Sequence, residues 1–330
     1  MVRQLTLACD WFMHLNMYQF PKQYETEICD EFPNIKIVPV NCPNFAKYEE
    51  NANIYFGNRI NDGDLFYMPH LNWIHFGSIG TDKISDKIAA QKKLTITNSR
   101  GTMEEAVAST AISFIFALAK GHNQIRQSIL DGSFSRDSYE KFFPFCSDVF
   151  NAKFCILGYG PIAQLLIKTL KVFSNHIRIV TRSKRDNEGV VFYDYSEISQ
   201  AVRNVDFIIN LLPKKDSTVN VVSNKVIKNF SKNTFYLNLG RSDTNDETFL
   251  LQSLEKGNLA GLALDVKSNN LEISKSLIKN CNIIISPHVA AVSQNYWCKQ
   301  MNIIRWNLDK YSSGAIKKMK NLVYIKGKCI

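Results

Sequence analysis

The sequence lacks several features that define common classes of protein. It contains no C-x-x-C pair, and its eight cysteines are scattered along the chain, at Cys9, Cys29, Cys42, Cys146, Cys155, Cys281, Cys298 and Cys329. This spacing argues against a zinc site or a disulfide framework, so we expect reduced, buried thiols and no bound metal. No apolar run reaches the roughly 20 residues that span a bilayer. The N-terminus "MVRQLTLACDWFMH" has no signal-peptide pattern, so we expect a cytoplasmic protein without membrane association.

An excess of acidic residues is also missing, because the net charge is +10 and the pI is near 9.1. A basic balance of this size is one signature of nucleic-acid binding. The lysines, however, are spread along the chain, and only the C-terminal "KKMKNLVYIKGK" is a dense cluster. We interpret the charge as a compositional bias and expect no nucleic-acid partner.

Short apolar runs alternate with longer amphipathic segments through most of the chain. The runs are "LTLAC", "IKIVPVN", "NIYFGN" and "NWIHFG", followed later by "FCILG", "IRIVT", "VDFIINLL", "TFYLNLG", "LAGLALDV" and "NIIISPH". Strands alternating with helices predict βαβ units and an open parallel sheet, so the fold class is α/β. Residues 102–129 predict one long, mostly buried helix, which marks a boundary between two domains.

A glycine-rich turn follows the run "FCILG". Gly158, Gly160 and Ala163 have the spacing G-x-G-x-x-A, and the amphipathic segment "PIAQLLIKTLKVF" continues from them. Gly158 permits a tight turn, and Gly160 lets a pyrophosphate approach the backbone at a helix N-terminus. Pro161 and Ile162 begin that helix and complete the expected phosphate-binding segment. The alternative is an ordinary βα turn that binds nothing.

The next strand, "IRIVT", lacks the acidic residue that holds the ribose 2′-hydroxyl of NAD. It runs instead into "TRSKR", where Arg182, Ser183 and Lys184 can bind a 2′-phosphate through charge-assisted hydrogen bonds. A solvated basic turn would have the same sequence. Because this turn lies where the cofactor ribose belongs, we favour NADPH as the cofactor.

Two reactive side chains follow later strands. Arg241 comes directly after "FYLNLG", and His288 follows "NIIISP". Ligands of open α/β sheets gather outside the carboxyl ends of the strands. An arginine there can bind a carboxylate and polarise the adjacent carbonyl, and a histidine can protonate a developing alkoxide. A surface ion pair for Arg241 and a purely structural role for His288 are the simpler readings.

The order of these motifs is similar to that of a known family. The segments "LGYGPIAQLL", "TRSKR", "NLLPKKDSTVNVV", "NLGRSDTNDETFLLQSLEKGNLAGLALDV" and "ISPHVAAVS" resemble the D-isomer-specific 2-hydroxyacid dehydrogenases, particularly their NADPH-preferring glyoxylate/hydroxypyruvate reductases. The resemblance spans residues 71–293 and includes "NWIHFGSIGTDKI" upstream. It implies two Rossmann/flavodoxin-like, doubly wound parallel-sheet domains with an interdomain cleft. A discontinuous substrate domain, residues 1–101 plus 290–330, would join a cofactor domain of residues 102–289.

The resemblance also implies roles for individual residues. The backbone at Ile79 and Gly80 would hold the substrate carboxylate beside Arg241, and His288 would donate the proton. Asp265 would lie near the nicotinamide. The cofactor pocket would also be lined by Leu212 and Pro213. The family usually forms homodimers through the cofactor domain.

The sequence departs from the family where a catalytic glutamate is expected. That glutamate lies five residues after the position of Asp265, where this chain has Asn270. Either Glu272 takes the role, or the histidine has no carboxylate partner and Asn270 occupies the position. A carboxylate beside an imidazole favours the imidazolium, whereas an asparagine contributes no charge. Ser242 also replaces the usual glycine after the arginine, which is a milder change.

The sequence therefore predicts a reductase that transfers a hydride from NADPH to a small 2-keto acid such as glyoxylate or hydroxypyruvate. The alternative is an NADP(H)-binding regulatory or scaffold protein that keeps the fold without efficient turnover. Asn270 motivates this alternative, and the presence of both Arg241 and His288 argues against it.

Overall fold

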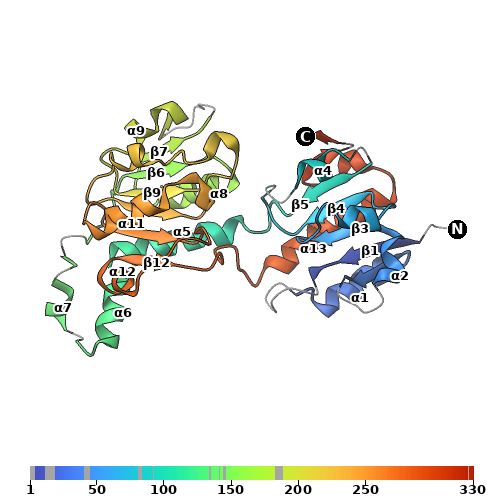
Figure 1. The fold of residues 1–330 in the computed structure, drawn as a ribbon, viewed down its shortest axis with the longest axis horizontal. Helices are drawn as coiled ribbons and strands as arrows, with labels where there is room; N and C mark the ends of the chain where they lie inside the picture. The colour runs from blue at the N-terminus through green and yellow to red at the C-terminus, as the bar shows by residue number, and fades with distance from the viewer. Residues whose placement is uncertain are drawn as a thin grey trace. The chain divides into compact units, whose positions relative to one another are not determined.

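The computed structural model describes residues 4–11, 19–40, 45–80, 84–91, 93–133, 135–140, 142–143, 146–182, 189–325 and 327–330. The chain divides into two compact units. One contains residues 1–103 and 292–330, and the other contains residues 104–291. Each has its own seven-stranded sheet (Figure 1). The expected α/β class with two mainly parallel sheets is confirmed.

The first unit is built on a sheet with the strand order β14-β13-β5-β4-β3-β1-β2. Strands β1 to β5 are parallel, and the C-terminal strands β13 and β14 add an antiparallel edge. The strands are Leu5–Cys9 (β1), Ile35–Pro39 (β2), Ala52–Gly57 (β3), Trp73–Phe76 (β4), Thr95–Asn98 (β5), Leu322–Ile325 (β13) and Lys328–Cys329 (β14). The helices are Lys22–Glu31 (α1), Ala46–Glu49 (α2), Asp64–Tyr67 (α3), Asp86–Ala89 (α4) and Tyr296–Ser312 (α13).

The second unit has the strand order β12-β11-β10-β9-β6-β7-β8, and all of its strand pairs are parallel. Its strands are Phe154–Leu157 (β6), Ile177–Val180 (β7), Val190–Tyr193 (β8), Phe207–Asn210 (β9), Phe235–Asn238 (β10), Gly261–Leu264 (β11) and Ile283–Ile285 (β12). Its helices are Glu104–Ala119 (α5), His122–Leu130 (α6), Arg136–Glu140 (α7), Pro161–Leu170 (α8), Ile198–Ala201 (α9), Asn224–Ile227 (α10), Glu247–Glu255 (α11) and Lys275–Asn280 (α12). This is the strand order of a dinucleotide-binding sheet. The strands β7 and β8 are added on one side of β6, and the strands from β9 onwards are added on its other side.

Aromatic side chains fix the register in the middle of the second sheet. Phe154, Phe207 and Phe235 occupy the same register row of β6, β9 and β10. Their rings stack with centroids 5.3 and 5.0 Å apart, and all three side chains are fully buried. Such pairs contribute about 0.5–1.5 kcal/mol each beyond the burial of their area. Because the first residues of these strands are aligned, their carboxyl ends are aligned as well.

The long helix expected over residues 102–129 is in fact two helices. Helix α5 ends at Ala119, and α6 begins at His122. Gly121 between them has a left-handed backbone with φ of 60°, which a continuous α-helix does not allow. Helix α5 packs against α8 and the strands β10 and β11, whereas α6 packs against α12 and α7 (Figure 1). No helix within the described ranges is long and apolar enough to cross a membrane.

Candidate functional site

The glycine-rich turn has the backbone that phosphate binding requires. Gly158 has a φ of 102°, a conformation that favours glycine, and Gly160 precedes the first residue of α8. No side chain caps α8, and a Cβ atom at Gly160 would meet no atom within 4 Å. The first N–H groups of a ten-residue helix therefore adjoin open space, where an anion is stabilised. These residues fit the pyrophosphate of a dinucleotide.

A close approach of two strand ends brings further predicted residues beside one another. A Cβ atom at Gly240 would lie 2.5 Å from the carbonyl oxygen of Leu212, so only glycine allows this contact. Leu212 is buried, and Pro213 beside it is exposed. The segment after β9 therefore lies against the turn that carries Arg241.

The predicted 2′-phosphate site is described only in part. Arg182 is exposed just beyond β7, and Ser183 and Lys184 lie outside the described residues. Burial raises the pKa of Tyr195, and the positive charge of Arg182 acts in the opposite direction. The guanidinium of Arg182 is therefore close enough to Tyr195 to affect the pKa of its hydroxyl.

The ends of β10, β11 and β12 form the walls of one pocket. Asn238, Leu264 and Ile285 share a register row, and Arg241, Lys267 and His288 each come three residues after it. The pocket has a volume of about 550 Å³. It is lined by Arg241, Ser242, Asp265, Val266, Lys267, Asn269, Ile285, Ser286, Pro287 and His288. The structure thus brings Arg241, Asp265 and His288 together, as the sequence predicts for one site.

Buried polar side chains hold the Arg241 turn in place. The carbonyl oxygen of Arg241 accepts hydrogen bonds from Thr244 Oγ1 at 2.6 Å and from Asn238 Nδ2 at 3.1 Å. Asn238 Oδ1 accepts a third bond from the N–H of Gly240 at 2.9 Å. Asn238 and Thr244 are fully buried, so their partners fix the backbone of the turn.

The carboxylate of Asp265 organises the loop that carries His288. Its Oδ1 accepts hydrogen bonds from Ser286 Oγ at 2.6 Å, the Val289 N–H at 2.9 Å and the Ala290 N–H at 3.1 Å. The N–H of His288 donates to the carbonyl oxygen of Asp265 at 2.9 Å. His288 itself is exposed and has a φ of 57°, which is uncommon for a residue with a side chain. The contacts of Asp265 therefore hold a strained loop.

Neither candidate for the missing glutamate lines the pocket. Asn270 and Glu272 are both exposed, and the neighbouring Asn269 is the loop residue that faces the pocket. A different carboxylate supports this loop, because both oxygens of the buried Glu247 accept from the N–H of Ser268 at 3.2 and 3.0 Å. The identity of the acid partner of His288 stays a prediction.

The predicted carboxylate-binding backbone lies in the first unit. Ile79 and Gly80 are half-buried just after β4. Asn98 Nδ2 donates to the carbonyl oxygen of Ile79 at 2.9 Å, and Ser78 Oγ donates to that of Gly80 at 3.4 Å. The side chains at the ends of β4 and β5 thus fix the conformation of this segment.

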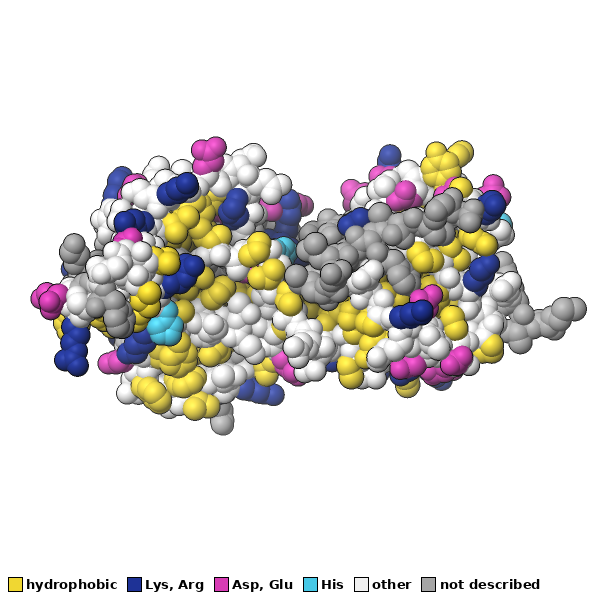
Figure 2. Space-filling view, turned by 90° about the horizontal axis from the view of Figure 1, so that it is seen from below, with side chains coloured by type: hydrophobic (Ala, Val, Ile, Leu, Met, Phe, Trp, Pro, Cys, Tyr) yellow, Lys and Arg dark blue, Asp and Glu magenta, His cyan; other side chains and the backbone are white. Residues whose placement is uncertain are grey.

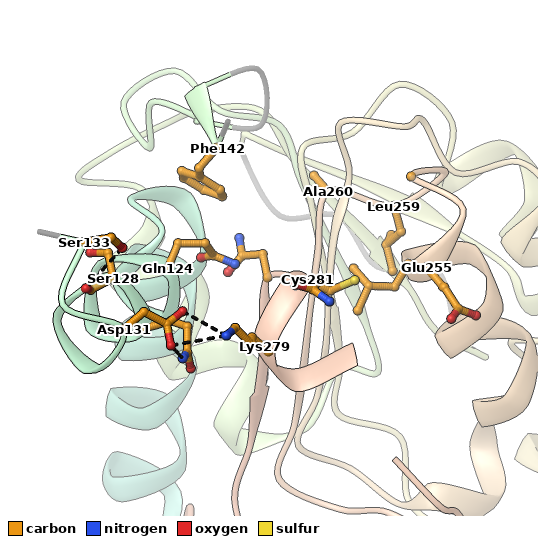
Figure 3. Close-up of a pocket in the computed structure, with 15 residues that line it drawn as sticks. Gln124, Ser128, Asp131, Ser133, Phe142, Glu255, Leu259, Ala260, Lys279 and Cys281 are labelled. Atoms are coloured by element: carbon orange, nitrogen blue, oxygen red, sulfur yellow. Dashed lines mark hydrogen bonds and ion pairs between the residues drawn. The ribbon is translucent and has the colours of Figure 1, made fainter. Parts of the chain in front are cut away.

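A second cavity of about 590 Å³ lies at the amino ends of strands β11 and β12, opposite to the end that forms the Arg241 pocket. Its lining includes Ala260 and Asn282, which precede β11 and β12, together with residues of α6, α11 and α12 (Figure 3). Asp131 and Lys279 form an ion pair there at 3.2 Å. Ligands of such sheets bind at the carboxyl ends of the strands, so this cavity is a weaker candidate than the Arg241 pocket.

The other sequence predictions concern thiols, metals and surface charge. The cysteines within the described ranges are all free, and burial raises the pKa of the Cys155 thiol to about 12. The expectation of buried thiols is wrong for most of them, because only Cys9 and Cys155 are buried among the described cysteines. No cluster of metal-ligating side chains occurs among the described residues. Lysine and arginine side chains are scattered over the visible face of the chain rather than gathered into one patch (Figure 2).

Sequence reasoning missed three polar residues of the pocket, namely Lys267, Asn269 and Ser286. Lys267 could have been found from the sequence, since it follows its apolar run at the same distance as Arg241 and His288 follow theirs. Ser286 and Asn269 had none, because their positions depend on how two loops fold against each other.

Comparison with known proteins agrees with this geometry. Residues 112–290 match the family model described as "D-isomer specific 2-hydroxyacid dehydrogenase, NAD binding domain". The match covers more than half of the chain, so the protein belongs to the D-isomer-specific 2-hydroxyacid dehydrogenase family, a family of oxidoreductases. The glyoxylate/hydroxypyruvate reductase A of Arabidopsis thaliana is 24% identical over 247 residues, which are 75% of this chain and 77% of the relative.

Solved structures show the same fold. The D-lactate dehydrogenase of Aquifex aeolicus, complexed with NAD and lactic acid, has a TM-score of 0.78 at 18% identity, covering 96% of this chain and 98% of that one. The NADPH-dependent glyoxylate/hydroxypyruvate reductase of Sinorhizobium meliloti, in complex with NADP and malonate, has a TM-score of 0.78 at 19% identity, covering 99% of both chains. The family and fold support the reduction of 2-keto acids with a nicotinamide dinucleotide in general.

Proposed function

We propose that this protein reduces a small 2-keto acid of the glyoxylate/hydroxypyruvate type with NADPH. The observation that carries the proposal is the pocket at the ends of β10, β11 and β12, where Arg241 and His288 come together. The phosphate turn at Gly158 lies on the same sheet, so cofactor and substrate sites share one scaffold. The family membership supports the reaction class.

The residues of the pocket suggest how the reaction proceeds. Arg241 binds the substrate carboxylate and polarises the neighbouring carbonyl. The backbone at Ile79 and Gly80 is proposed to hold the same carboxylate. Reduction adds a hydride, which the nicotinamide supplies when bound, to the carbonyl carbon. His288 gives a proton to the carbonyl oxygen, so that the product is the 2-hydroxy acid. Asp265 keeps the His288 loop in place through the three hydrogen bonds that its carboxylate accepts from this loop.

The preference for NADPH rests on the turn after β7. Arg182 is exposed there, and no acidic residue precedes it in the strand that would repel a 2′-phosphate. One structural neighbour is an NADPH-dependent reductase, whereas another was solved with NAD, so the neighbours support either cofactor. The sequence "TRSKR" favours NADPH between the two.

For the catalytic acid we propose that Asn270 occupies the position of the family glutamate and that no carboxylate replaces it directly. Glu272 is exposed and lies outside the pocket lining, as Asn270 does, which supports the absence of a direct carboxylate replacement. His288 then donates the proton without a carboxylate beside it.

An activity test decides between an enzyme and a binding protein. NADPH oxidation is followed at 340 nm with glyoxylate, hydroxypyruvate and longer 2-keto acids, for the wild type and for His288→Ala. We expect reduction by the wild type and a loss of about 10²–10⁴-fold in kcat for the variant, the usual contribution of a general acid. Tight NADPH binding without reduction of any keto acid would favour the regulatory or scaffold alternative. Undiminished activity of His288→Ala would refute the role of this residue.

We also propose a homodimer that forms through the cofactor domain, in the cytoplasm. Helix α6 ends in the adjacent Ile129 and Leu130, which are 57% and 64% exposed. Exposed apolar side chains so close together are typical of a protein interface. Light scattering should give twice the chain mass of 37.7 kDa, and the mass of a single chain would refute the dimer.

A further inference from the structure

The pocket at the ends of β10, β11 and β12 contains more positive charge than one carboxylate requires. Arg241, Lys267 and His288 each stand three residues beyond a common register row, on three adjacent strands. Neighbouring strands are about 4.8 Å apart, so Lys267 enters the pocket between the other two cationic or protonatable residues. All three line the cavity.

The pocket lining also contains one carboxylate, Asp265, whose oxygens are directed away from the cations. Asp265 is only 2% exposed, and its oxygens accept hydrogen bonds from Ser286, Val289 and Ala290. It therefore faces its own loop. Glu272, the other acid of this loop, is exposed and outside the lining.

Lys267 is positioned by the loop on which it lies. Its ammonium donates to the carbonyl oxygens of Ser268 and Leu271, both at 3.2 Å. The loop is in turn anchored by Glu247, which accepts from the N–H of Ser268. An ammonium has three N–H donors, so one remains for a ligand. These contacts fix the ammonium on a loop whose residues Lys267 and Asn269 line the pocket, and they leave it able to bind an anion.

We infer that Lys267 selects substrates with a second anionic group, so that the 2-keto acid of the proposed function carries a further carboxylate or a phosphate. This inference rests on the proposed function for the position of the keto acid. Arg241 binds the carboxylate next to the carbonyl, and Lys267 binds the second anion. A charge-assisted hydrogen bond of this kind is stronger than one between neutral groups.

Matched pairs of ligands test the inference by binding. Calorimetry on the NADP⁺-loaded protein compares 2-ketoglutarate with 2-ketovalerate, which has the same five carbons and one carboxylate. A second arm compares 3-phosphohydroxypyruvate with hydroxypyruvate, and thereby distinguishes a phosphate from a carboxylate. Because the oxidised cofactor cannot reduce the ligand, the measurement stands even if turnover fails.

We expect the doubly charged member of at least one pair to bind about tenfold more tightly, the effect of one hydrogen bond between charged groups. Lys267→Gln should remove this preference without changing the affinity for the singly charged member, and Lys267→Arg should keep it. Lys232→Gln is the matched control, since this exposed lysine precedes the amino end of β10, whereas the pocket lies at its carboxyl end.

Two results would overturn the inference. One is equal affinity within both pairs, and the other is a loss in Lys267→Gln that is the same for singly and doubly charged ligands. The proposed function is judged separately, by NADPH oxidation with the same compounds. A protein that binds the doubly charged ligands through Lys267 but reduces none of them would keep the inferred anion site and lose the enzymatic role.

Discussion

The loop from Ser286 to Ala290 should depend on the charge of Asp265 rather than on its shape alone. Asp265→Asn keeps the size of the side chain but replaces one carboxylate oxygen by an amide that donates. Oδ2 accepts from the Ala290 N–H at 3.1 Å, so an amide there would face another donor. The bonds to Ser286 and Val289 would become bonds to a neutral acceptor.

The magnitude follows from these contacts. Hydrogen bonds to charged groups contribute about 1.5–3 kcal/mol, and neutral ones about 0.5–1.5 kcal/mol. Weakening the three bonds at Oδ1, and turning an amide donor toward the Ala290 N–H, should cost about 2–4 kcal/mol in the stability of the loop. Since every 1.4 kcal/mol is a factor of ten, the open form should become roughly 100-fold more populated. The φ of 57° at His288 then relaxes, because the loop no longer enforces it.

Amide hydrogen exchange measures this effect directly. Exchange at Val289 and Ala290 should accelerate by roughly 100-fold in Asp265→Asn, the factor that follows from the weakened bonds. Exchange in β8, at the far edge of the same sheet, should not change. Ser286→Ala is the matched control, because it removes one donor and leaves both backbone bonds to the carboxylate. Unchanged exchange in Asp265→Asn together with wild-type kcat would refute the assigned role of this carboxylate.

Two further predictions concern the core of the first unit and the glycine-rich turn. Burial lowers the pKa of His75 to about 3, whereas the unfolded chain binds its proton near pH 6.5. The folded state is therefore destabilised as pH falls below 6.5, by about 2 kcal/mol at pH 5, and urea unfolding at pH 7 and pH 5 should show this loss in the wild type but not in His75→Gln. At the phosphate turn, Gly160→Val should fold with an unchanged Tm, because its Cβ meets no atom within 4 Å. Its affinity for NADPH should fall by more than about tenfold, since the side chain enters the space before α8, and wild-type affinity by fluorescence titration would contradict the assignment of this turn.

The sequence was sufficient for those parts of the fold that depend on local patterns. All ten apolar runs named as strands are strands, because buried parallel strands are continuously apolar and stand out between amphipathic helices. Strands β5 and β8 escaped notice, since "TITN" and "VVFY" are short and contain polar or half-exposed residues. Strands β13 and β14 were missed as well, because they lie in the C-terminal segment that stands out by its lysines. The break between α5 and α6 depends on a single glycine with a left-handed backbone, Gly121, and glycine also occurs inside helices.

The site was predictable to the extent that strand ends determine it. Arg241 and His288 follow apolar runs directly, so the topology alone brings them to one edge of the sheet. The loop after β11 follows no such rule. Its course is set by the Glu247 carboxylate on the N–H of Ser268, a contact between residues 21 positions apart in sequence. That contact is why Asn269, and neither Asn270 nor Glu272, faces the pocket.

The proposed placement of Asn270 at the family's glutamate position separates two roles that a glutamate beside a catalytic histidine combines. One role is to hold the imidazole in place, and the other is to favour its protonated form by charge. In this chain the backbone of His288 is already held by its bond to Asp265 and by the bonds of the next two residues to the same carboxylate. Under this proposal the Asp265 carboxylate positions the backbone of His288 without the glutamate. We therefore expect His288 to keep its place in the pocket lining.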